Sequence, residues 1–148
     1  MKLEGRSKRR KEREETSIQG EAQYFFEGRP TTSEALILIV TPQGAGVVIS
    51  CPLHYGQMVQ LRFRMPRELR LYDLHASLYE IWGVVRFVVK APGQEEVEDR
   101  YEIGIAFTGK TAPPQYLDNP ETLFDLKPMP RRDGLWSVRT APRVADRF

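Results

Sequence analysis

The sequence ALILIVTPQGAGVVIS, at residues 35–50, shows the β character of this chain most clearly. Ala35 to Val40 has the length and nearly continuous apolarity of a buried strand. Turn residues follow at Thr41-Pro42-Gln43-Gly44, and Ala45 to Ser50 resumes the strand pattern. The stretch predicts two consecutive strands joined by a short turn.

Further strand signals lie on both sides of this pair. Alternation places Ile18, Ala22, Tyr24 and Phe26 on one side of a strand, and a second alternating segment has the apolar face Val59, Leu61 and Phe63. Gly83 is expected to mark a bulge or bend in a long strand. Pro66–Tyr72 fits either a helical turn or a loop. The additional predicted strands are Thr16–Phe26, residues 58–64, His75–Val89 and Tyr101–Phe107.

Many short strands with little helix favour a barrel or a sandwich. The chain has 148 residues, of which 41% are hydrophobic, which suffices for one core. After Thr108 the strand pattern stops, and prolines punctuate a polar segment with room for one short helix at Glu121–Leu126. We therefore expect a basic N-terminal arm at 1–15, a barrel at 16–110, and a partly disordered C-terminal extension at 111–148.

Charge is distributed unevenly along the chain. Residues 1–15 carry seven basic and four acidic side chains, and residues 127–148 carry six and two. The stretch between them has nine basic and fourteen acidic residues, a net charge of −5. Both ends are therefore expected to attract anions, whereas the acidic body between them is not expected to do so.

The residue content argues against several functional classes. Cys51 is the single cysteine, and only His54 and His75 accompany it, so we expect no metal site. No apolar run has the roughly 20 residues of a membrane helix, and no secretory signal is present, so we expect a cytoplasmic protein without membrane insertion. Because the sequence contains no nucleophile elbow or phosphate loop, we expect a binding protein and not an enzyme, with no bound cofactor.

Four sequence features occur in a defined order. Arg9 and Arg13 have the spacing Arg-x-x-x-Arg before the first strand, and Ile39 to Gly44 lies between the second and third strands. Gly83-Val84-Val85-Arg86-Phe87 and Tyr101 to Phe107 follow as later strands. Their order resembles that of the PilZ domain, a bacterial six-stranded antiparallel β-barrel whose members commonly bind the second messenger cyclic diguanylate (cyclic-di-GMP). The likeness spans about residues 9–108.

The resemblance implies a ligand site made by Arg9, Arg10, Arg13, Thr41 and Gly44. Arginine suits this ligand because its planar fork pairs with phosphate oxygens and with guanine O6 and N7. The second motif departs from the family pattern, because Ile39 replaces an acidic or amide residue and Thr41 replaces serine. A lost hydrogen bond at Ile39 would cost about 1 to 3 kcal/mol, or about tenfold to a hundredfold in affinity.

Three functions remain open on these observations. The first is a cyclic-di-GMP receptor that couples ligand binding to a protein partner. The second is a degenerate PilZ-like interaction module that no longer binds the nucleotide, which Ile39 favours. The third is nucleic-acid binding through both basic ends, which the acidic body disfavours. The basic arm can also be only a solvated tail, and Thr41–Gly44 only an ordinary turn.

Overall fold

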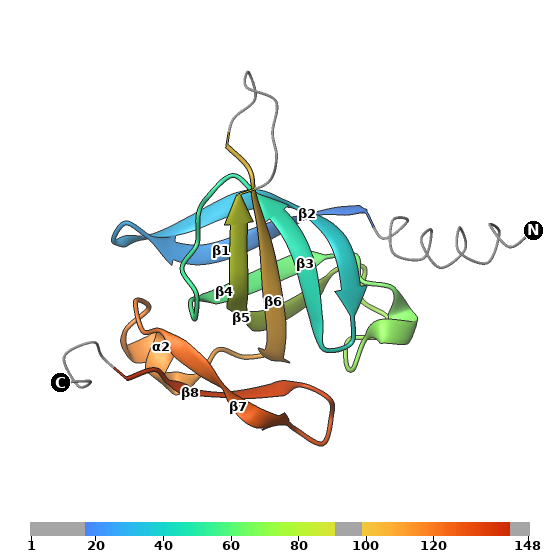
Figure 1. The fold of residues 1–148 in the computed structure, drawn as a ribbon. Coiled ribbons are helices and arrows are strands. Elements are labelled where there is room, and N and C mark those ends of the chain that lie inside the picture. Colours follow the sequence, from blue (N-terminus) through green and yellow to red (C-terminus); the bar gives the residue numbers. More distant parts are fainter. Residues whose placement is uncertain (1–16, 91–98, 143–148) are drawn as a thin grey trace, which may run out of the picture.

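The computed structural model describes residues 17–90 and 99–142. Six antiparallel strands form a closed barrel (Figure 1), which confirms the expected six-stranded barrel, and their order is β1-β2-β3-β6-β5-β4. β1 pairs with β2, and β2 pairs with β3. β3 then pairs with β6, and β1 pairs with β4 to close the sheet. The barrel strands are β1 (Ile18–Phe26), β2 (Arg29–Thr41), β3 (Gly44–Ile49), β4 (Met58–Phe63), β5 (Tyr79–Lys90) and β6 (Tyr101–Gly109).

Alternation sorts the side chains between the barrel interior and its outer face. Val59, Leu61 and Phe63 are fully buried in β4, and Ala22 and Tyr24 are buried in β1, as the pattern predicted. Burial of such apolar area is the main contribution to barrel stability. The tyrosine hydroxyl at position 24 is hydrogen-bonded to the Ser33 hydroxyl. The interpretation of residues 35–40 as buried throughout was wrong, because Ile39 is 44% exposed.

The loop between β4 and β5 is held by one buried arginine. The 3₁₀ helix η1 (Arg67–Leu69) confirms the helical turn that the sequence allowed. Arg70, only 8% exposed, donates hydrogen bonds to the carbonyls of Met65, Asp73, Ala76 and Ser77. Its guanidinium also lies 5.4 Å from the ring centroid of Tyr79. The expected bulge at Gly83 is present, since the register of β5 against β6 shifts between Trp82 and Gly83.

The C-terminal extension contains regular structure that the sequence did not indicate. The short helix α2 (Pro114–Asp118) begins with a proline in its first turn, whereas the helix predicted at residues 121–126 is absent. The backbone N–H of Phe124 instead donates to the Gly56 carbonyl at 2.8 Å, and Phe124 begins β7 (Phe124–Pro130). β7 pairs with β8 (Trp136–Thr140) as a separate two-stranded sheet. Pairing with the barrel segment therefore overrides the local helical preference.

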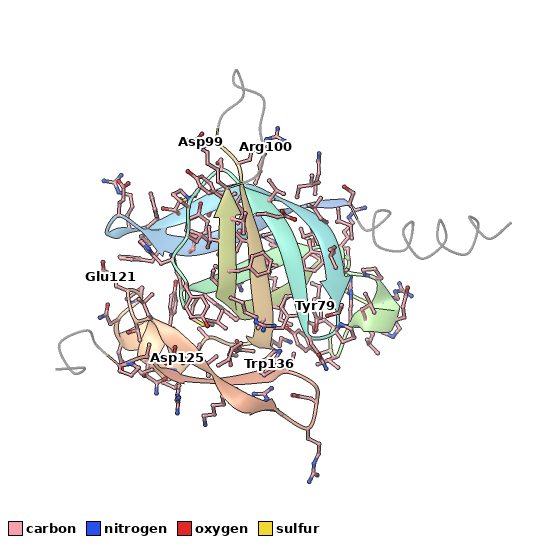
Figure 2. The ribbon with its side chains drawn as sticks, in the orientation of Figure 1. Tyr79, Asp99, Arg100, Glu121, Asp125 and Trp136 are labelled. Atoms are coloured by element: carbon pink, nitrogen blue, oxygen red, sulfur yellow. The ribbon has the colours of Figure 1, made fainter. Side chains whose placement is uncertain are left out.

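The β7–β8 hairpin lies against the outside of the barrel, below β5 and β6 in the view of Figure 1. A second apolar cluster forms there, separate from the interior core. Trp136 occupies the junction between hairpin and barrel (Figure 2). Leu135, at the start of β8, is 3% exposed and joins the interior core itself. The fully or nearly fully buried members of the second cluster are Met58, Val84, Ala106 and Phe124.

Candidate ligand-binding site

The turn Thr41-Pro42-Gln43-Gly44 joins β2 to β3 at one end of the barrel. Thr41 pairs with Gly44, and the Thr41 hydroxyl accepts a hydrogen bond from the Gln43 N–H at 3.2 Å. The same hydroxyl donates to the Gly44 carbonyl at 3.4 Å. Hydroxyl-to-backbone bonds of this kind stabilise a tight turn. Thr41 is exposed, so its hydroxyl is accessible to a ligand while it also shapes the turn.

Gly44 is required by the packing of two strands. A Cβ atom at this position would lie 2.5 Å from the Ile105 carbonyl oxygen in β6. The missing side chain therefore allows β3 and β6 to approach, and it is not space left open for a ligand. Gly44, which the resemblance places in the ligand site, thus has a packing role that the sequence did not indicate.

Ile39 lies two residues before Thr41 on the outer face of β2. Its Cα partner in β3 is Gly46, and the register of β2 against β3 shifts between Ile37 and Ile39. A β-bulge redirects side chains, and here Ile37 is fully buried while Ile39 is exposed. The second motif thus presents an apolar side chain to solvent at the position where the PilZ pattern has a hydrogen-bonding group.

The three candidate arginines, Arg9, Arg10 and Arg13, lie outside the described residues. The structure nevertheless fixes the point where the chain enters the barrel. Ile18, the first residue of β1, pairs with Ile37, so the chain enters at the barrel end where β2 finishes at Thr41. Five residues can span at most about 17 Å, so Arg13 is within reach of the turn.

Sequence reasoning missed a row of residues that crosses four strands beside this turn. The row is formed by residues that are Cα partners from one strand to the next: Ile39 on β2, Gly46 on β3, Gly104 on β6 and Phe87 on β5. Phe87, at the end of this row, is 49% exposed. The available signal was the pair of glycines inside strands, which often mark a close approach of another group.

A broad groove of about 1220 Å³ lies elsewhere on the barrel surface. It crosses β1 and β2 and reaches Asp99 and Arg100, which lie on the side of the barrel away from Trp136 (Figure 2). Acidic and basic side chains alternate along it, and Arg62 is paired with Glu80 at 3.4 Å. Neither Thr41 nor Gly44, the two candidate residues that the structure describes, lines this groove. Its charged lining residues are Glu21, Glu34, Arg62, Asp99 and Arg100.

The titratable groups of the described residues do not form a reactive cluster. No group of three or more histidine, cysteine, aspartate or glutamate side chains is placed to hold a metal ion within residues 17–90 and 99–142. His54 and His75 are exposed, and Cys51 is buried. Burial raises the pKa of the Cys51 thiol, which keeps the thiol protonated and unreactive.

No family model, curated protein or solved structure matches this chain. Within the described ranges, every helix is too short or too polar to cross a bilayer.

Proposed function

We propose that this chain is a receptor for cyclic diguanylate, with the ligand held at the outer face beside the Thr41–Gly44 turn. The observation that supports the proposal is that β1 begins at the barrel end where the Thr41–Gly44 turn lies. β1 begins opposite Ile37, and the Thr41–Gly44 turn ends β2 four residues later. Arg9, Arg10 and Arg13 precede Ile18 by nine, eight and five residues, which is enough chain for them to reach a ligand beside the turn.

The chemistry of the two motifs suits a compact dianion with two guanines. Arginine contributes paired hydrogen bonds to phosphate or guanine, and its planar group can stack on a purine. The exposed Thr41 hydroxyl adds a short-range donor or acceptor beside the backbone of the turn. Coupling to a protein partner would follow if the bound ligand alters the surface that the protein offers to that partner.

A second candidate function is a PilZ-like module that binds a protein and no nucleotide. Its specific support is the exposed apolar surface of Ile39, Phe87 and Val89, which are 44%, 49% and 52% exposed. Exposed apolar side chains gathered on one face favour protein contact. The two candidates differ in one measurable property, the affinity for cyclic diguanylate.

Isothermal titration calorimetry with cyclic diguanylate tests the proposal. The wild-type chain should bind with micromolar or tighter affinity, and the Arg9→Ala, Arg13→Ala double variant should not bind. Lys8→Ala, Lys11→Ala is the matched control, since it removes the same charge from the same segment but keeps the Arg-x-x-x-Arg spacing. Equal loss in both double variants would indicate unspecific charge attraction, and absence of heat in the wild type would favour the interaction module.

A further inference from the structure

The outer face beside the turn contains a flat floor with an aromatic ring at one side. Gly46 and Gly104 are direct partners on β3 and β6, so no side chain rises between them. A Cβ built at Gly104 would come within 2.1 Å of the Phe87 ring, which shows that the ring lies over this glycine. A Cβ at Gly46 would meet only the Ile39 side chain, at 3.8 Å. The floor over β3 is therefore open.

Two bulges direct the side chains that border this floor. The register of β2 shifts between Ile37 and Ile39, and the register of β5 shifts between Val85 and Phe87. As a result, the neighbouring residues Arg86 and Phe87 are both exposed, although alternation would bury one of them. Bulges are common beside binding sites because they redirect a side chain. Ile39 and the ring over β6 are two strand spacings apart, about 10 Å, which leaves room for a base between them.

Arg86 adds a positive charge to the same border. Its guanidinium lies 5.6 Å from the ring centroid of Trp136, which holds it at the edge where the hairpin meets the barrel. Within the described residues Arg86 forms no ion pair, whereas Arg131, in the hairpin, is paired with Asp133 at 2.7 Å. An aromatic face beside an unpaired cation is the combination that binds a base and its phosphate.

We infer that Phe87 stacks on one purine of the ligand over the Gly46 floor, and that Arg86 contacts the adjoining phosphate. The inference rests on the proposed function and adds two residues on β5 that were not among the ligand-site residues expected from the sequence. Ile39 then borders the base as an apolar wall, which gives a physical role to the residue that breaks the second motif.

The test measures the affinity for cyclic diguanylate by isothermal titration calorimetry in four single variants. Phe87→Leu keeps an apolar side chain but removes the ring, and it should weaken binding about 5-fold to 100-fold, the range measured for one base stacked on one aromatic ring. Gly46→Val should weaken binding at least tenfold by filling the floor. Arg86→Gln should weaken binding and reduce its dependence on salt. Val89→Ala is the matched control, because Val89 is exposed two residues further along β5.

The outcomes separate this inference from the function on which it rests. Gly46→Val is expected to fold normally, since its Cβ makes only an ordinary van der Waals contact with Ile39 and valine favours strands, so it remains informative if Phe87→Leu proves unstable. Wild-type binding with unchanged affinity in Phe87→Leu and Gly46→Val would overturn the stacking site but leave the receptor intact. Absence of binding by the wild type would overturn both.

Discussion

Replacing Phe124 by alanine should destabilise the whole protein. The side chain is 1% exposed and packs against Met58, Val84 and Ala106 on the outer face of the barrel. Removing a buried phenylalanine side chain typically costs about 3 to 5 kcal/mol, a large part of the total of about 5 to 15 kcal/mol for a domain. For a chain of this size the melting temperature should fall by about 6 to 20 °C.

Leu123→Ala is the matched control, because Leu123 is the neighbouring residue but is 42% exposed. It should change the free energy of unfolding by less than about 1 kcal/mol. Urea denaturation should be followed by both circular dichroism and tryptophan fluorescence. The chain has two tryptophans, Trp82 and Trp136, and both pack in the cluster between hairpin and barrel. Fluorescence therefore reports the docking of the hairpin, and circular dichroism reports the barrel.

The two signals should change together, at a lower urea concentration in Phe124→Ala than in Leu123→Ala. Equal midpoints for the two variants would refute the packing argument. A fluorescence transition that precedes the circular dichroism transition in the wild type would also refute it, because the hairpin would then unfold separately from the barrel.

Arg70→Ala should lower the free energy of unfolding by about 2 to 5 kcal/mol in urea denaturation, because four backbone carbonyls lose their buried donor. The exposed Arg67→Ala should change it by less than about 0.5 kcal/mol, and equal effects would contradict the role of the buried guanidinium. Gly44→Ala should cost about 1 to 3 kcal/mol, because its Cβ would lie 2.5 Å from a backbone oxygen, whereas Gly46→Ala should leave the melting temperature unchanged. Burial raises the pKa of Tyr24 to about 12 from 10.0. Tyr24 therefore ionises at lower pH in the unfolded chain than in the folded protein, and the stability that it confers below pH 10 should be lost as the pH rises toward 12. Tyr24→Phe should reduce the pH dependence of the free energy of unfolding measured by urea denaturation. An unchanged pH dependence would count against the raised pKa of Tyr24.

The strand pattern predicted the barrel because alternation is a local property. Val59, Leu61 and Phe63 are buried as a period-two pattern requires, and the turn at Thr41–Gly44 follows from its residue types. Ile39 was misplaced because a single-residue bulge reverses the side on which an apolar residue lies. Composition gives no sign of such a register shift.

The C-terminal hairpin was missed because its stability comes from contacts distant in sequence. Phe124 bonds to Gly56, nearly seventy residues earlier, and Leu135 enters the interior core. The prolines and polar residues of this segment interrupt the local alternation that would indicate a hairpin. Contacts distant in sequence also explain why the sequence did not reveal the row on the outer face, since its alignment depends on the register of four strands. The row consists of Ile39, Gly46, Gly104 and Phe87.

The location of the ligand is measured most directly by two-dimensional nitrogen–proton spectra recorded during titration with cyclic diguanylate. The account predicts that the amides of Gln43, Gly44, Gly46 and Gly104 shift as ligand is added, while those of Glu34 and Ser50, which line the groove, do not. Shifts confined to the groove, or no shifts at all, would contradict the account.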